Sequence, residues 1–151
     1  RNFQGYSTRA GRDLVGLGMS AISHIGATFT QNAKTLPTYY EKIDRGELPV
    51  VSGLEMTKDD SIREHVIMGL MCDLKINKVN VNEKFGIDFD HYFSSSLHDL
   101  DDLISNGLVI DTPTAIIITE KGRFFLRNIA MCFDAYIAKS ILDKPVFSKT
   151  L

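Results

Sequence analysis

The side chains that could do chemistry are scattered along the chain and form no recognisable motif. Cys72 and Cys132 lie far apart in the sequence, a spacing that suits neither a metal site nor a disulfide framework. Each falls within a helical pattern of apolar residues, so we expect two reduced thiols that pack as small hydrophobic side chains. Composition and spacing alone therefore assign no catalytic residue.

The histidines and acidic residues offer one metal-site hypothesis. His91 and His98, together with Asp99 or Asp102, could bind a metal ion from one helix. Charged and polar residues of this kind more commonly form a solvated helix face, and we favour that interpretation. No metal-binding residue is assigned.

Length and composition are those of an ordinary globular protein. The 151 residues suffice for one good core, or for one small domain with a remnant of another. The formal net charge is −2, which gives no general attraction to nucleic acids or anionic membranes. No apolar run is long enough to span a bilayer. We therefore expect a cytoplasmic monomer without nucleic-acid or membrane partners.

Residues 1–46 combine glycine-rich, strand-like sequence with one helix. Two strand-like pieces, Leu14–Leu17 and Ala27–Thr30, are separated by glycines and small polar residues. A helix is predicted for Lys34–Asp44, with a proline in its first turn, where a missing N–H costs little. Residues 47–56 are interpreted as a linker. Because such strands normally lean on neighbours, we expect the chain to be the C-terminal piece of a larger enzyme.

Residues 57–142 are predicted to form a second, mostly helical domain, followed by a tail at residues 143–151. Thr57 and Asp60 form a capping-box pattern ahead of a helix whose apolar residues repeat at helical spacing. The elements expected after it are a short turn or helix at Asn77–Gly86, a helix over about Asp90–Asn106, a hairpin of Leu108–Ile110 with Ile116–Ile118, and a long helix from Thr119 to Ile137. This order is that of a winged-helix domain, so the predicted fold class is α+β.

A winged helix suggests DNA binding, but the charges argue against it. The helix that would enter the major groove carries four aspartates, at positions 90, 99, 101 and 102, and no lysine or arginine occurs from Phe85 through Glu120. Non-specific DNA affinity comes mostly from neutralising phosphates. We therefore interpret the winged helix as a packing module.

Three motifs carry a resemblance to a known family. They are Asn2-Phe3-Gln4-Gly5-Tyr6, the run from Gly16 to Ser23 (GLGMSAIS), and the run from Arg127 to Asp134 (RNIAMCFD). Weaker matches lie between them, at Gln31-Asn32, Tyr39-Tyr40, Leu48-Pro49, Asp59-Asp60 with Arg63, and Thr119 to Arg123. Taken in this order, the chain resembles the C-terminal third of the oxygen-independent coproporphyrinogen III oxidases, which are radical S-adenosylmethionine enzymes.

The resemblance implies a fold and a reaction. In the family, an incomplete β/α barrel holds a four-iron, four-sulfur cluster that receives electrons from a donor and cleaves S-adenosylmethionine to a 5′-deoxyadenosyl radical. The radical removes hydrogen from a propionate side chain of coproporphyrinogen III, and loss of carbon dioxide leaves a vinyl group. Two such events give protoporphyrinogen IX in haem biosynthesis. Residues 1–46 are then expected to be the last strands and helix of that barrel.

The resemblance also implies three site residues and one departure from the family. Ile22 is expected to contact S-adenosylmethionine, and Phe3 and Gln4 to line the same cavity. The three cysteines that bind the cluster are absent, and Cys72 and Cys132 cannot replace them. The chain alone is therefore expected to be inactive.

An alternative function comes from the predicted domain order alone. A winged-helix domain can also serve as a regulatory or protein-interaction module. Such a module would expose an apolar patch and form a dimer or a complex with a partner.

Overall fold

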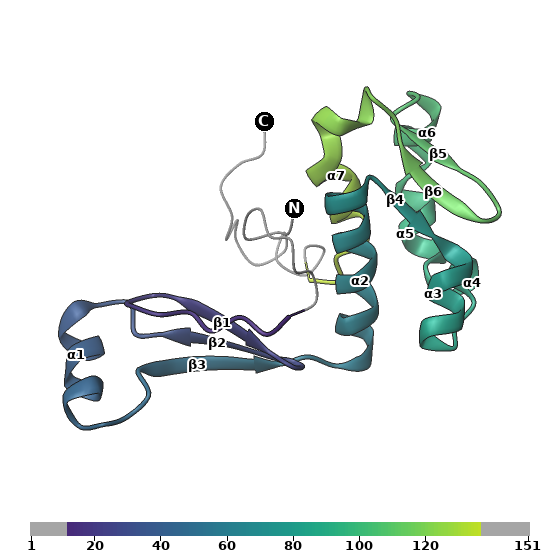
Figure 1. Ribbon diagram of the computed structural model, residues 1–151. Helices are drawn as coiled ribbons and strands as arrows, with labels where there is room; N and C mark the ends of the chain where they lie inside the picture. The colour runs from purple at the N-terminus through teal and green to yellow at the C-terminus, as the bar shows by residue number, and fades with distance from the viewer. Residues whose placement is uncertain (1–11, 137–151) are drawn as a thin grey trace. The chain divides into compact units, whose positions relative to one another are not determined.

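A computed structural model describes residues 12–136, which form two compact units, residues 12–61 and residues 62–136. Each unit contains one three-stranded sheet (Figure 1). Both helices and strands occur, which confirms the prediction of a fold that mixes α and β elements.

The first unit is an antiparallel sheet with one helix. Strands β1 (Ile22–Ile25), β2 (Thr28–Asn32) and β3 (Val50–Glu55) lie in the order β1-β2-β3, and α1 (Leu36–Asp44) connects β2 to β3. The helix begins after Thr35 with Pro37 in its first turn, as predicted. Figure 1 shows α1 beyond one end of the strands.

Three expectations for this unit need correction. Residues 47–56 are not a plain linker, because they contain β3: Pro49 precedes the strand, and Val50 and Val51 begin it. The piece Leu14–Leu17 forms only a single antiparallel bridge, between Leu14 and His24. The strands pair antiparallel, whereas those of a β/α barrel are parallel, so this sheet does not confirm the expected barrel strands.

The second unit combines short helices with a small sheet. Its elements in chain order are α2 (Lys58–Asp73, which starts within the first unit), β4 (Lys75–Asn77), α3 (Lys78–Phe85), α4 (Phe89–Tyr92), α5 (Ser94–Asp99), α6 (Asp101–Ser105), β5 (Val109–Asp111), β6 (Ala115–Ile118), η1 (Gly122–Phe125) and α7 (Leu126–Met131). The sheet order is β4-β6-β5, with antiparallel pairs.

The predicted cap of α2 is confirmed by its hydrogen bonds. The Thr57 amide donates to Asp60 Oδ2 at 2.8 Å, and the Asp60 amide donates to Thr57 Oγ1 at 3.1 Å. The short helix α3 is capped by Asn77, whose side chain accepts from the Asn80 amide at 3.0 Å. Local hydrogen bonds thus define both helix starts.

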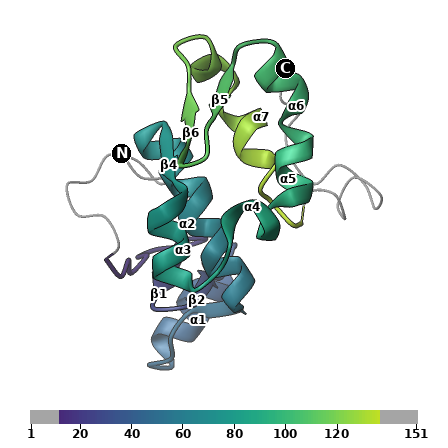
Figure 2. The same cartoon turned by 90° about the vertical axis from the view of Figure 1, so that its right-hand side faces the viewer.

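The two longer helices predicted in this unit are interrupted. The run over Asp90–Asn106 is divided into α4, α5 and α6, which follow one another in Figure 2. The breaks fall at Phe93 and Leu100, whose side chains are both buried. The run after Thr119 is η1 followed by α7, because Phe125 leaves helical geometry at φ −109° and ψ 17°. Ile137 lies outside the described residues.

A close contact explains how η1 begins. Gly122 lies against the Leu108 carbonyl and leaves no space for a Cβ atom. Thr119 Oγ1 accepts from the Gly122 amide at 3.0 Å and donates to the Gly107 carbonyl at 2.8 Å. The start of η1 is therefore fixed to the chain that enters the hairpin.

The core of the second unit gathers apolar side chains from α2, the short helices and the sheet. Phe89, Phe93 and Phe133 form an aromatic cluster, with ring centroids 4.8 Å apart for the first pair and 5.4 Å for Phe93 and Phe133. The guanidinium of Arg63 lies 5.5 Å from the centre of the Phe93 ring, and its Nη1 donates to the Phe133 carbonyl at 2.9 Å. Arg63 thereby joins α2 to the segment after α7.

Candidate cofactor-contact site

A tight loop at residues 16–21 precedes β1 and is held by Asn32. The buried Asn32 side chain donates to the carbonyls of Gly16 at 3.2 Å and Gly18 at 2.9 Å. Its backbone amide donates to the Ala21 carbonyl at 2.9 Å. One asparagine on β2 therefore satisfies three carbonyls of the loop.

Gly16 brings this loop against the first residue of β1. A Cβ atom on Gly16 would lie 2.5 Å from the Ile22 carbonyl oxygen, so only glycine fits. The Gly16 amide donates to Ser23 Oγ at 3.0 Å. Ser20 takes a left-handed φ of 59°, and its amide donates to the Ala33 carbonyl at 2.8 Å. The glycine-rich motif thus fixes the backbone of Ile22.

Ile22 lies at the edge of a hollow on one face of the first sheet. The hollow has a volume of about 290 Å³ and is lined by Ile22, Phe29, Thr30, Gln31, Ser52, Gly53 and Leu54. Ile22 is 47% exposed and Leu54 is 54% exposed, although both are large apolar residues. An apolar surface of this kind is typical of a binding surface.

The sheet register explains which side chains share this face. Ile22 pairs with Gln31, which pairs with Ser52 on β3. Phe29 pairs with Leu54 one step along, and the Phe29 ring stacks on His24 at 4.0 Å between centroids. Directly paired residues of antiparallel strands lie on one face, so Gln31 and Ser52 add an amide and a hydroxyl to the face that carries the apolar side chain of Ile22.

The chemistry available in the hollow is binding. Within residues 12–136, none of the side chains that line the hollow is ionisable, so none of these can act as a general acid or base near neutral pH. The apolar residues can pack against a flat or aliphatic group, while Gln31 and Ser52 can donate and accept hydrogen bonds. The hollow can therefore hold and orient a small molecule.

The structure places one of the three site residues expected from the sequence. Ile22 lines the hollow, whereas Phe3 and Gln4 lie outside the described residues. Gln31 and Ser52 line the same hollow but were not among the residues expected from the sequence. Their place beside Ile22 depends on the β2–β3 register, and the two β-branched residues Val50 and Val51 were the only local signal for that strand.

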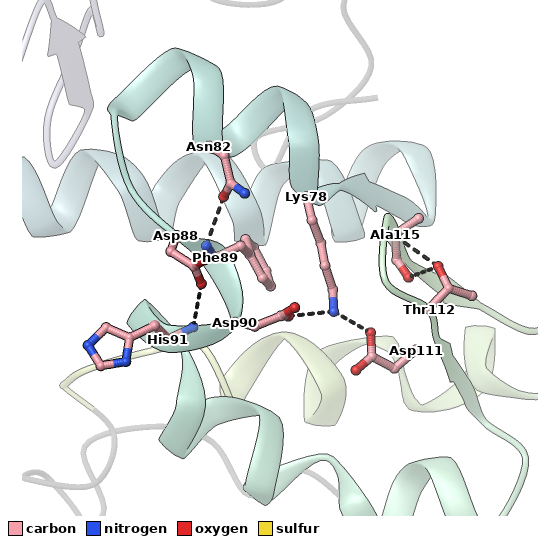
Figure 3. Close-up of polar contacts among 9 residues, drawn as sticks. All are labelled: Lys78, Asn82, Asp88, Phe89, Asp90, His91, Asp111, Thr112 and Ala115. Atoms are coloured by element: carbon pink, nitrogen blue, oxygen red, sulfur yellow. Dashed lines mark hydrogen bonds and ion pairs between the residues drawn. The ribbon is translucent and has the colours of Figure 1, made fainter.

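The second unit holds a buried cation between two carboxylates (Figure 3). Lys78 is 3% exposed, and its Nζ lies 2.6 Å from Asp90 Oδ1 and 2.7 Å from Asp111 Oδ1. Burial lowers the pKa of Lys78, but the hydrogen bonds and charges of Asp111 and Asp90 outweigh it, and the pKa is raised. Lys78 therefore stays charged and joins α3 to α4 and the hairpin.

In the part of the chain that the structure describes, the cysteines and the possible metal ligands do not come together in a metal site. Among residues 12–136, no group of three or more histidine, cysteine, aspartate or glutamate side chains could hold a metal ion. Cys72 and Cys132 are partly buried and free. Burial, and then the charge of Asp99, raise the pKa of the Cys132 thiol, which disfavours the reactive thiolate. Within the same residues, no helix is long and apolar enough to cross a membrane.

Comparison with known proteins confirms the resemblance inferred from the sequence. Residues 56–125 match the family model of the HemN C-terminal domain. The chain is 43% identical over 137 residues to the oxygen-independent coproporphyrinogen III oxidase of Salmonella typhimurium, covering 91% of this chain and 30% of the relative. The enzyme of the same name from Pseudomonas aeruginosa is 39% identical over 151 residues, covering 100% of this chain and 32% of the relative.

A solved structure shows the same similarity in three dimensions. Coproporphyrinogen III oxidase (HemN) from Escherichia coli, described as a radical SAM enzyme, matches with a TM-score of 0.86 and 41% identity. The match covers 90% of this chain and 31% of that structure. The chain therefore spans about a third of the length of the relatives that it matches.

Proposed function

We propose that this chain is the C-terminal part of an oxygen-independent coproporphyrinogen III oxidase. The whole enzyme would convert coproporphyrinogen III to protoporphyrinogen IX by oxidative decarboxylation of two propionates. The observation that carries the proposal is the agreement of sequence and structure with the Escherichia coli enzyme, at 41% identity and a TM-score of 0.86 over 90% of the chain.

The residues of the hollow fit contact with S-adenosylmethionine, the source of the organic radical in this class of enzyme. The hollow of about 290 Å³ is near the lower end of the size of small-molecule sites, roughly 300–1,000 Å³, and suits one part of such a ligand. Ile22 supplies a branched apolar surface that can pack against the adenosyl group and exclude water. The loop held by Asn32 keeps that surface in place.

The iron–sulfur cluster needs ligands from beyond this chain. The sequence has only Cys72 and Cys132, and family clusters need a closely spaced cysteine triplet. We therefore propose that other parts of the enzyme bind the cluster, and that the electron donor reduces the cluster there. By itself this chain should have no oxidase activity.

We also propose a winged-helix fold for the second unit. The order α2-β4-α3, then α4 to α6, then the β5–β6 hairpin is that of a winged-helix domain. The acidic run without basic residues suits packing against protein better than against DNA. We assign residues 62–136 to a winged-helix packing module, and residues 12–61 to the part that joins the barrel of a cytoplasmic, monomeric enzyme.

The site assignment can be tested in a full-length enzyme that carries this chain. Ile22→Ala should reduce protoporphyrinogen IX formation on the order of a hundredfold, because reactions of this kind depend on alignment to about 1 Å. Gln4→Ala should also lower turnover, as the resemblance implies. Both variants should keep the iron–sulfur absorbance, since neither residue is a cluster ligand.

Ile25 provides a matched control on the same strand. It is 49% exposed, close to the 47% of Ile22, but three residues along β1 it lies on the opposite face. Ile25→Ala should leave turnover near the wild-type value. Equal activity of Ile22→Ala, Ile25→Ala and wild type, with the cluster fully loaded, would refute the assignment of Ile22.

A further inference from the structure

Gln31 and Ser52 line the hollow, and the function described so far assigns neither of them a specific ligand contact. Gln31 is the register partner of Ile22, and Ser52 is the register partner of Gln31. The three side chains therefore form one row across β1, β2 and β3 on the same face. All three line the hollow.

Along this row, Ile22 presents an apolar side chain, Gln31 an amide and Ser52 a hydroxyl. Gln31 Nε2 donates one hydrogen bond, to the Ser20 carbonyl at 3.4 Å. The side chain still has a second N–H and the two lone pairs of Oε1 for a ligand. The Ser52 hydroxyl can both donate and accept. Phe29 and Leu54 form the next row, which is apolar.

An adenosyl group carries the complementary pattern. Its purine has apolar faces and a polar edge with an amino donor and ring-nitrogen acceptors, and its ribose carries two hydroxyl groups. A site built only of apolar side chains discriminates weakly between ligands of similar shape. A site with hydrogen-bonding groups rejects an analogue that leaves those groups unpaired.

We propose that Gln31 and Ser52 hydrogen-bond the polar edge of the adenosyl group of S-adenosylmethionine while Ile22 packs against its apolar surface. The inference rests on the proposed function and adds to it the residues that select the ligand. Gln31 and Ser52 are positioning residues in this account, because they carry no reactive group.

The first test is binding, measured by anaerobic equilibrium dialysis of S-adenosylmethionine with the full-length enzyme. Gln31→Met keeps the length of the side chain and removes the amide, and Ser52→Ala removes the hydroxyl. Each variant should raise the Kd about tenfold, the typical cost of one lost hydrogen bond to a ligand. Glu55→Gln, on the opposite face of β3, should leave the Kd unchanged.

A second measurement separates ligand contact from a purely structural role. The dialysis is repeated with analogues of S-adenosylmethionine that lack the purine amino group, the ribose 2′-hydroxyl or the ribose 3′-hydroxyl. Wild type should bind at least one analogue about tenfold more weakly, and Gln31→Met or Ser52→Ala should abolish that discrimination, as expected when the two changes remove one contact.

The outcomes distinguish this inference from the proposed function. Weaker binding in Ile22→Ala, with wild-type Kd values and full discrimination in Gln31→Met and Ser52→Ala, would overturn the inference and leave the function standing. Wild-type Kd values in all three variants would overturn the inference together with the assignment of Ile22. Weaker binding in the two polar variants with discrimination between analogues unchanged would also overturn it, because only folding would then have been affected.

Discussion

Lys78 Nζ lies 2.7 Å from Asp111 Oδ1, and this contact connects the start of α3 to the β5–β6 hairpin. The Lys78 side chain is 4% exposed, whereas Asp111 is 28% and Asp90 is 56% exposed. A buried charge costs free energy unless it is paired, so Lys78 depends on these carboxylates. Asp111, being less exposed, should be the more important partner.

Removing the carboxylate of Asp111 should therefore destabilise the second unit. We expect Asp111→Asn to lower the free energy of unfolding by roughly 1.5–3 kcal/mol, the range for a hydrogen bond to a charged group. Asp90→Asn should cost less, because solvent screens that pair. Urea denaturation of the three proteins measures the difference. A cost for Asp90→Asn equal to or larger than that for Asp111→Asn would contradict this ranking.

The raised pKa of Lys78 predicts a pH dependence at alkaline pH. A lysine whose pKa in the folded state lies above its usual 10.5 stabilises the fold at pH values below 10.5. This stabilisation is lost as the pH rises above 10.5 and through the pKa of the folded state. Wild type should therefore lose more stability than Lys78→Met between neutral pH and pH values above 10.5. Parallel stability profiles for the two proteins would show that Lys78 does not titrate as described.

At pH 6.5, where an ordinary histidine is half protonated, His65 should carry less charge, because its pKa is lowered. Burial, and then the charge of Lys84, lower its pKa from 6.5, and Lys84 Nζ lies 3.3 Å from His65 Nδ1. Because the unfolded chain binds the proton more readily, stability should decrease as pH falls below 6.5. In NMR titrations, Lys84→Met should raise the His65 pKa towards its usual value. An identical midpoint in both proteins would be inconsistent with the contribution of Lys84.

The acidic helices predict that the chain does not bind duplex DNA. Asp99, Asp101 and Asp102 are exposed, and no lysine or arginine occurs between Phe85 and Glu120 to neutralise phosphates. Fluorescence anisotropy with a labelled duplex should detect no binding even at low salt, where electrostatic attraction is strongest. Saturable, sequence-selective binding below about micromolar concentration in ~50 mM salt would reverse this conclusion.

The elements that could be predicted from sequence are those fixed by nearby residues. The cap of α2 depends on a hydrogen bond between residues three positions apart, and this helix begins where Thr57 places it. The segment Asn77–Gly86, predicted as a short turn or helix, is the helix α3, and its cap by Asn77 was found only in the structure. The hairpin strands β5 and β6 also lie where their apolar runs were predicted. Local capping and turn chemistry are readable without tertiary structure.

The elements that could not be predicted depend on contacts with distant residues. Strand β4 has only three residues, too few for a periodic pattern to indicate a strand. Its pairing partner β6 comes about forty positions later in the sequence. Strand β3 was hidden by Pro49 and Gly53, and it forms because β2 is beside it. Ile22 could be proposed from a family motif, but the position of Gln31 and Ser52 beside it follows only from the sheet register.

If this chain supplies the C-terminal part of an oxygen-independent coproporphyrinogen III oxidase, it should be able to replace the corresponding segment of a related enzyme. The matching third of the Escherichia coli enzyme is replaced by this chain, and protoporphyrinogen IX formation from coproporphyrinogen III is measured anaerobically with S-adenosylmethionine and a reductant. We predict S-adenosylmethionine-dependent turnover within about tenfold of the parent enzyme, and none from this chain alone. A folded hybrid with a full iron–sulfur spectrum but no turnover would contradict the account.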